Sequence, residues 1–348
     1  MRGLVVGAAM LALMASAAHG GVWVFGDSTV DTGWYKVSPF SGNNKFDFDL
    51  QYSAQYGIGK PTNNPGPMSV EVLAFVFFAE ARPANQGGTN YATSGAKNTN
   101  ANTPLNGGFP NAIPTVTQIA NYLEQHAPGR RDLFVVSSGG NDVSYALTGL
   151  SGSAQTAYIQ QQAAKLAAGI QQLQVAGARY IIVANLPASF GTAAEIAARA
   201  LYNTSLQTTL GSSGVEYAWG DVNAVRERIV ADPALFGIRY VTNAAGEIAC
   251  QQPNAALNIT SAWALLCSKN SPVTRPTTFA AEALFADDEH WASSAQTILG
   301  SYYACLAART WPRQLTLSLP TLPRKELRRP PTPCRLLFPR PDQPSSAH

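Results

Sequence analysis

The chain has 348 residues, of which 46% are hydrophobic and only 13% are charged. This composition provides for a sizeable apolar core, and it excludes a long solvated helix or a disordered protein. The formal net charge of +3 does not indicate a nucleic-acid partner. Seven Arg or Lys and only two acidic residues fall within 311–348, so the rest of the chain has no basic stripe.

The first 20 residues have the pattern of a secretory signal peptide. One Arg precedes an apolar stretch from Leu4 to about Met14, and small residues follow through Ala18. A retained N-terminal anchor is the alternative, but the apolar run is short for a membrane-spanning helix. We therefore expect residues 1–20 to be removed, no integral membrane span, and a protein that is secreted to the extracellular space or the periplasm.

Residues 21–310 alternate short β-rich runs with helical patterns, and this alternation predicts one α/β domain. Strands are predicted at 22–28, 132–142 (running into a Gly-rich turn) and 179–187, and helices at 69–81, 113–127, 154–177, 191–210, 221–231 and 294–308. Strands separated by helices imply βαβ crossovers and a central parallel sheet covered on both faces. In such sheets, ligands bind beyond the carboxyl ends of the strands.

Two segments differ from this pattern. Residues 36–66 are loop-like and rich in Asn, Gly, Pro and aromatic residues; they either cover a substrate cleft or form an ordinary surface insertion. Residues 311–348 contain nine prolines and many arginines, which predicts a disordered tail without a packed core.

Export would place the cysteines in an oxidising compartment, where disulfides form and persist. Cys250 and Cys267 bracket a polar, loop-like stretch, so we expect a disulfide between them. No CxxC or His-rich spacing indicates zinc, and no metal site is predicted.

Histidine limits the choice of a general base, since it fills this role most often near neutral pH. His19 borders the signal peptide, His348 ends the chain, and His126 reads as a solvent-facing helix end. His290, in "FADDEHW", lies three residues after Asp287. An Asp at this spacing can turn its carboxylate toward the imidazole Nδ1 and leave Nε2 free to accept a proton.

This pair also has a plainer interpretation. Asp287 and Asp288 would simply cap the last helix, and His290 would be solvated. The pattern Asp-x-x-His gains weight only from partners elsewhere in the chain.

Ser28, at the end of "VWVFGDS", is the obvious partner. It is either a nucleophile at a strand–helix junction, with its own N–H pointing at an oxyanion, or the N-cap of the next helix. Gly95 in "NYATSGAKN" and Asn141 in "SSGGND" offer backbone and side-chain donors to such an oxyanion. Each turn alone is ordinary, but Ser28 and Asn141 both lie at carboxyl ends of predicted strands.

Four blocks in this order, "FGDS", "NYATSGA", "GGND" and "DDEH", resemble the GDSL esterases and lipases of the SGNH hydrolase superfamily, over roughly residues 22–308. The resemblance implies a flavodoxin-like, three-layer α/β/α sandwich. It also implies Ser28 as nucleophile, Asp287 and His290 as its triad partners, and Gly95 and Asn141 as oxyanion donors beside the Ser28 N–H. By the same resemblance, Asp27 and Asp31 of the first block have supporting roles.

The sequence departs from the family pattern at several positions. Thr93 and Ser94 precede Gly95 where relatives commonly carry smaller residues, Trp291 stands where Pro is frequent, and Trp34 stands where the first block often has Asn. No catalytic group is lost, and the spacing favours Asp287 over Asp288 as the acid that orients the histidine.

We therefore expect a secreted serine esterase or lipase that cleaves carboxylic esters through an acyl-enzyme, without a metal or other cofactor. Its substrates are expected among small-molecule, lipid or acylated-carbohydrate esters. A carbohydrate acetylesterase is one alternative, since the aromatic stretch 46–56 could stack on sugars. A non-catalytic surface module or autotransporter passenger of the same fold is another, because the Pro-rich tail starts where a linker would.

Overall fold

The computed structural model describes residues 20–36, 59–63, 66–99, 112–244, 246–250, 264–267 and 281–312. The expected signal peptide, most of segment 36–66 with its aromatic stretch, and nearly all of the Pro-rich tail lie outside these residues.

A parallel sheet forms the centre of the domain. Its strands are β1 (Val22–Gly26), β2 (Leu133–Ser137), β3 (Tyr180–Ala184) and β4 (Ala218–Gly220), hydrogen-bonded in the order β1-β2-β3-β4. All three neighbouring pairs are parallel, with Val24 opposite Val135 and Val135 opposite Ile182. The strands predicted at 22–28, 132–142 and 179–187 are confirmed in shorter form. The short β4 was not predicted.

Both faces of the sheet are buried, because alternate side chains of each strand enter different cores. Val24, Val135 and Ile182 belong to one hydrophobic cluster. Phe25 and Phe134 belong to the other, on the opposite face. Strands buried on both faces read as continuous apolar runs, which explains "VWVF" and "LFVV" in the sequence.

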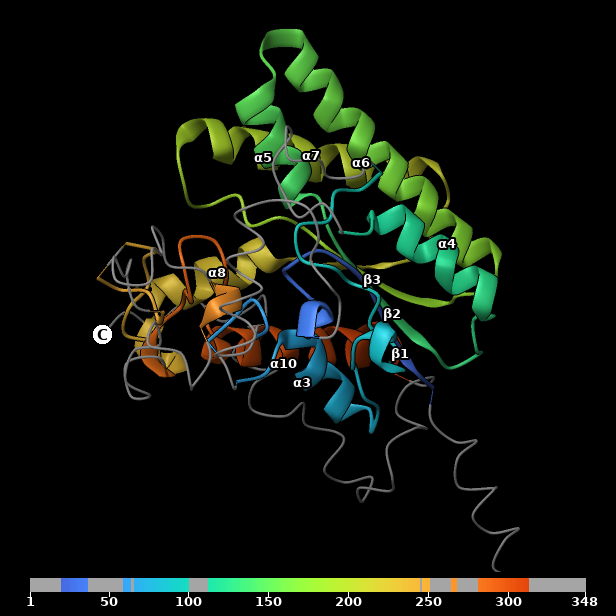
Figure 1. Ribbon diagram of the computed structural model, residues 1–348, viewed down its shortest axis with the longest axis horizontal. Helices are drawn as coiled ribbons and strands as arrows, with labels where there is room; N and C mark the ends of the chain where they lie inside the picture. The colour runs from blue at the N-terminus through green and yellow to red at the C-terminus, as the bar shows by residue number, and fades with distance from the viewer. Residues whose placement is uncertain are drawn as a thin grey trace, which may run out of the picture.

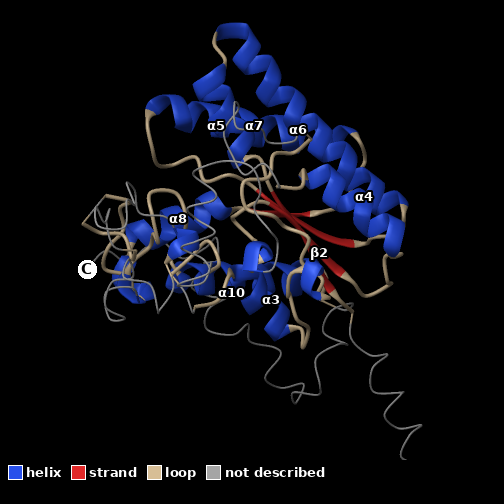
Figure 2. Cartoon of the chain, in the orientation of Figure 1, coloured by secondary structure: helices blue, strands red, loops and turns tan. Residues whose placement is uncertain are grey.

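Two layers of helices cover these faces (Figures 1 and 2). The helices are α3 (Ser69–Val76), α4 (Thr115–Gln125), α5 (Gly140–Gly149), α6 (Gly152–Val175), α7 (Ala193–Ser212), α8 (Val222–Ala231) and α10 (Ser293–Thr310). Figure 1 places α4, α5, α6 and α7 on one side of the sheet and α3, α8 and α10 on the other. The expected three-layer α/β/α architecture is confirmed, and it is consistent with the SGNH hydrolase fold.

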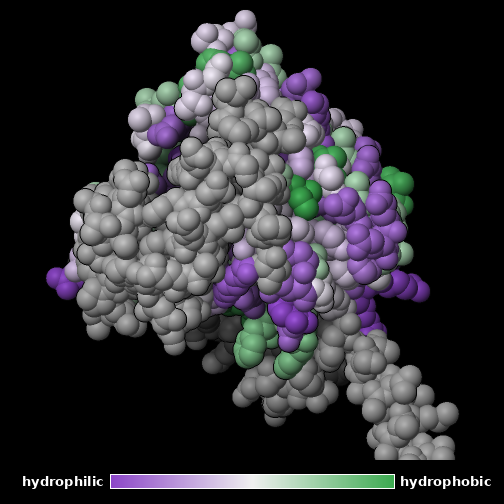
Figure 3. All heavy atoms as spheres, viewed as in Figure 1, coloured by the Kyte–Doolittle hydropathy of each residue, from purple (hydrophilic) through white to green (hydrophobic). Residues whose placement is uncertain are grey.

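The helix boundaries follow local chemistry. Thr192 and Glu195 form a capping box at the start of α7, in which each side chain satisfies a backbone N–H of the other residue. The helix predicted at 69–81 ends instead at Val76, and Phe78 follows with a left-handed φ of 55°. Hydrophilic side chains cover the outer surface of α4 in Figure 3, while its inner face buries Ile119 and Tyr122. This amphipathic pattern is what predicted α4.

A further segment pairs with the free edge of β1. The Val24 N–H donates to Thr89 O, the Tyr91 N–H to Val24 O and the Thr93 N–H to Gly26 O. This parallel pairing brings the end of segment 89–93 to the same edge of the sheet as the carboxyl ends of β1 and β2. The turns that contain Ser28, Gly95 and Asn141 therefore leave one edge of the sheet.

Two findings bear on export and membranes. Cys250 and Cys267 form a disulfide across a sequence separation of 17. Within the part of the chain that the structure describes, none of the helices combines the length and the apolar character needed to cross a membrane.

Candidate active site

Ser28 lies on a turn directly after β1. The Val30 and Asp31 N–H groups both donate to Asp27 O, at 3.2 and 3.1 Å, which closes one turn without starting an α-helix. The expectation that a helix begins at Ser28 is therefore wrong. Asp27 caps the turn instead: its buried Oδ1 accepts from the Thr29 N–H at 3.0 Å and the Thr29 hydroxyl at 2.7 Å.

Because Asp27 supplies the cap, the Ser28 hydroxyl is not used for capping. Burial raises the pKa of Asp27, although the hydrogen bonds from Thr29 favour its ionised form. Asp27 thus supports the turn that presents Ser28.

Asp31 joins this turn to the one that contains Gly95. Its Oδ1 accepts from the N–H groups of Gly33 and Trp34, both at 2.8 Å. Its Oδ2 accepts from the Ser94 N–H and hydroxyl, and the whole side chain is buried. Burial raises the pKa of Asp31, while these donors oppose the rise. The hydroxyl of Ser94, a departure from the family pattern, thus adds a bond between two blocks of the site.

A hydrogen bond joins Asn141 to the turn that contains Gly95. Gly95 adopts a left-handed φ of 81°, which favours glycine. The next residue, Ala96, accepts a hydrogen bond from Asn141 Nδ2 at 3.0 Å. One N–H of the Asn141 amide is thereby fixed, and the amide lines the same cleft as Ser28.

The start of α5 holds Asn141 in place. Gly139 precedes the helix with φ 121°, and a Cβ there would lie 2.2 Å from Cζ of Tyr202. The sequence did not predict α5 as a helix. Asp142 is buried and its Oδ2 accepts from the Asn98 N–H at 2.8 Å, which adds a second bond between segment 96–98 and α5. Burial raises the pKa of Asp142 to about 7.

Asp287 and His290 form a close pair on the loop before α10. His290 Nδ1 lies 2.8 Å from Asp287 Oδ2 and 3.0 Å from Oδ1. Asp287 Oδ1 also accepts from the N–H groups of Glu289 and His290, and Oδ2 accepts from the Ala264 N–H at 2.7 Å. With Nδ1 occupied by the carboxylate, Nε2 is the imidazole nitrogen left for a substrate proton.

The electrostatics of this pair follow from burial and charge. Burial alone would lower the pKa of His290, but the Asp287 carboxylate, with smaller contributions from Glu289 and Asp27, raises it to about 9. Burial would raise the pKa of Asp287, but the His290 imidazolium and the surrounding donors hold it below its usual value. Each partner therefore favours the charged form of the other.

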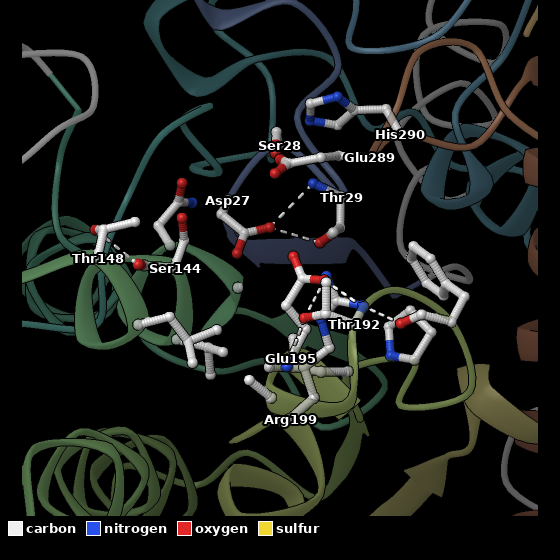
Figure 4. A pocket seen from close by; sticks show the side chains of 18 residues that line it. Asp27, Ser28, Thr29, Ser144, Thr148, Thr192, Glu195, Arg199, Glu289 and His290 are labelled. Carbon is white, nitrogen blue, oxygen red and sulfur yellow. Dashed lines mark hydrogen bonds between the residues drawn. The ribbon is translucent and has the colours of Figure 1, made fainter. Parts of the chain in front are cut away.

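A cleft of about 430 Å³ is lined by Ser28, Asn141 and His290, whereas Gly95 and Asp287 are not among its lining residues. Figure 4 shows the His290 ring turned toward Ser28. Its walls are both apolar and polar; the lining includes Val143, Ser144, Leu147, Thr148, Leu186, Pro187, Phe190, Thr192, Glu195 and Arg199. This volume lies within the range usual for small-molecule sites.

The sequence did not single out one wall of this cleft, the loop 186–190 after β3. Asn203 pairs with both backbone groups of Leu186, and the Asn223 side chain accepts from the Ala188 N–H, each bond at 2.8 Å. Phe190 lies under two guanidinium groups, with Arg199 4.6 Å and Arg226 4.8 Å from its ring centroid. Only the position of this loop after a predicted strand pointed to it.

Other candidates fall outside the site. His126 is exposed at the end of α4, where its ring packs 4.9 Å from that of Trp23. Asp288 is exposed and makes no contact with His290 Nδ1, so the neighbouring Asp287 is the residue that faces the imidazole. Among the described residues, no cluster of His, Cys, Asp or Glu could hold a metal ion.

Comparison with known proteins places this geometry in a family. A search of curated proteins returned no match. A family model described as GDSL-like lipase/acylhydrolase matches residues 22–301, which include all of the sheet and the Asp287–His290 pair. The chain therefore belongs to the GDSL-like lipase/acylhydrolase family, and this membership supports its assignment as a hydrolase that acts on esters.

Proposed function

We propose that the protein is a secreted serine esterase that hydrolyses carboxylic esters through an acyl-enzyme on Ser28. The observation that carries this proposal is the Asp287–His290 pair, whose imidazole lines the same cleft as Ser28. The Ser28 hydroxyl makes no hydrogen bond with described residues. Catalytic contacts of this kind often shorten only when substrate binds.

The proposed reaction has two stages. His290 Nε2 takes the hydroxyl proton as Ser28 Oγ attacks the ester carbonyl, and Asp287 stabilises the imidazolium that forms. The resulting oxyanion accepts hydrogen bonds from the N–H groups of Ser28 and Gly95 and from Asn141 Nδ2. His290 gives its proton to the leaving alcohol, then activates a water molecule that releases the acid and restores Ser28.

The disulfide supports the proposed localisation. Cys250 and Cys267 are bonded in the structure, and such bonds persist mainly in oxidising compartments. This agrees with the signal-peptide pattern at residues 1–20.

The test is hydrolysis of p-nitrophenyl butyrate by Ser28→Ala, with Ser144→Ala as its matched control. Both serines line the cleft, so the two variants remove the same group from different places. We expect Ser28→Ala to lower kcat by at least about 10⁴-fold and to abolish labelling by a fluorophosphonate probe, while Ser144→Ala keeps both. Turnover by Ser28→Ala within tenfold of the wild type would reject Ser28 as the nucleophile.

A further inference from the structure

Glu289 places a carboxylate in the cleft that the proposed mechanism does not use. Its backbone N–H donates to Asp287 Oδ1 at 2.9 Å, which fixes the main chain between the two triad residues. Its side chain lines the cleft, and Figure 4 shows the carboxylate extending toward Ser28. It also lines a second cavity of about 60 Å³ beside His290.

Among the described residues, the Glu289 carboxylate has no bonded partner, and its charge makes only a minor contribution to the raised pKa of His290. Within the described residues its carboxylate accepts no hydrogen bond and forms no ion pair within 4 Å, and the residue is exposed at the cleft. Glu195, the other glutamate of the cleft, differs: its carboxylate binds the Thr192 N–H and hydroxyl in the capping box of α7. Glu289 has no such structural role.

Several carboxylates act on His290. The charges of Asp287, Glu289 and Asp27 all raise the pKa of its imidazole. Arg199 is a second cationic residue of the cleft lining, besides His290, and its guanidinium donates to Phe190 O at 2.9 Å. Desolvation in the cleft raises the pKa of Glu289, and the charges of His290 and, to a smaller extent, Arg199 oppose the rise.

A carboxylate here has two opposed effects on the chemistry: it helps to stabilise the His290 imidazolium, but it repels negative charge that develops on the substrate. The tetrahedral intermediate on Ser28 carries a negative charge, which a neighbouring carboxylate repels. Residues that break a local rule without a compensating contact are expected at functional sites. Recognition of the substrate is a function that fits a carboxylate in the cleft. A positively charged group on the substrate, by contrast, would be attracted by the Glu289 carboxylate.

We propose that Glu289 is a specificity-determining residue, which favours esters with a cationic group close to the scissile bond and disfavours anionic esters. This inference rests on the proposed function. It adds a charge class to the substrate and assigns a recognition role to a residue outside the triad and the oxyanion hole.

Three thioacetates of similar size test the inference in one thiol-release assay: cationic acetylthiocholine, neutral S-(3,3-dimethylbutyl) thioacetate and anionic S-acetyl-2-mercaptoethanesulfonate. We expect wild-type kcat/KM to fall in that order. Glu289→Gln should lower the cation-to-neutral ratio of kcat/KM roughly fivefold and the neutral-to-anion ratio by a similar factor, because it removes one unit charge beside the ester. Raising the ionic strength should weaken the wild-type preference in the same direction.

Asp288→Asn is the matched control, since Asp288 is an adjacent exposed carboxylate that lines neither cavity. Unchanged ratios in Glu289→Gln, or equal changes in the control, would overturn the inference. Ser28→Ala distinguishes a failure of this inference from a failure of the proposed function. If that variant is inactive and the ratios still do not respond to Glu289→Gln, then only the charge preference is wrong; if it remains active, the proposed function is wrong.

Discussion

Asp31 and Ser94 join two turns of the candidate site through one carboxylate oxygen. Asp31 Oδ2 accepts from the Ser94 N–H at 2.9 Å and from its hydroxyl at 2.6 Å. Since Asp31 follows Ser28 by one turn and Ser94 precedes Gly95, this contact sets the position of the turn of Ser28, the proposed nucleophile, relative to Gly95, a proposed oxyanion donor.

Replacing Asp31 should therefore affect both stability and rate. Asp31→Asn places an amide among four donors and leaves at least one buried N–H without an acceptor. We expect a loss of about 1–3 kcal/mol in the free energy of unfolding, and a fall in kcat that exceeds any change in KM. Urea denaturation and steady-state kinetics measure the two effects.

Ser94→Ala serves as the graded control, because it removes the hydroxyl bond and keeps the backbone bond. Its loss of stability should be about 1 kcal/mol and smaller than that of Asp31→Asn. Equal losses in the two variants would show that the carboxylate does not act through the backbone of the Gly95 turn.

Asn141 should matter more for kcat than for substrate binding. Asn141→Asp keeps the size of the side chain but replaces the amide donor with a carboxylate, so kcat should fall by about 10²–10³-fold or more. Asn141→Ala should lose a similar factor without the added repulsion. A variant whose KM rises while kcat holds would point to a substrate-binding role instead.

The pH dependence of activity follows from His290. In the proposed mechanism His290 is the general base and must be neutral, so kcat/KM should rise with pH through the pKa of about 9 in the free enzyme. Asp287→Asn removes the charge that raises this pKa, and its remaining activity should show an acid limb at lower pH. A wild-type limb near pH 6.5 would contradict the electrostatic coupling of the pair.

The stability contribution of His290 has the opposite pH dependence. Its pKa is raised by folding from 6.5 to about 9, so the stabilisation is complete below pH 6.5 and is lost as the pH rises through about 9. Melting temperatures measured across this range should decline as activity increases. Asp287→Asn should flatten the decline, and an unchanged slope in that variant would assign it to other groups.

The disulfide should support the position of Asp287 as well as the fold. The Cys250 N–H donates to Ala286 O at 2.9 Å, and segment 264–267 carries both Cys267 and the N–H of Ala264 that binds Asp287. Replacing both cysteines by serine should lower the free energy of unfolding by about 3 kcal/mol. It should also reduce kcat. A double variant with wild-type kcat would separate the disulfide from the position of Asp287.

The sequence predicted a structural feature well where a single element determines it, and less well where contacts between several elements determine it. Continuous apolar runs predicted three of the strands, and the periodic pattern of 154–177 predicted α6. The pairing of Asp287 with His290 depends on a spacing of three positions within one loop, so spacing alone suggested it. The capping role of Asp27 was missed because Asp27 and Ser28 are both good caps, and only the backbone bonds to Asp27 O distinguish them.

Other features depend on contacts between distant segments. The helix α5 begins within a Gly-rich stretch, and its start is fixed by packing of Gly139 against Tyr202 on α7. The cleft wall at 186–190 is assembled by side chains of α7 and α8. Neither arrangement leaves a periodic pattern in the local sequence.

The anchoring of loop 186–190 has a consequence for engineering. Its backbone is held by Asn203 and Arg199 from α7 and by Asn223 and Arg226 from α8. If this loop were grafted alone into another hydrolase, it would lose these anchors and become mobile. A graft that also transfers the four anchoring side chains would keep the shape of the loop. The shape of the cleft in this protein therefore depends on the loop together with helices α7 and α8, which hold its backbone.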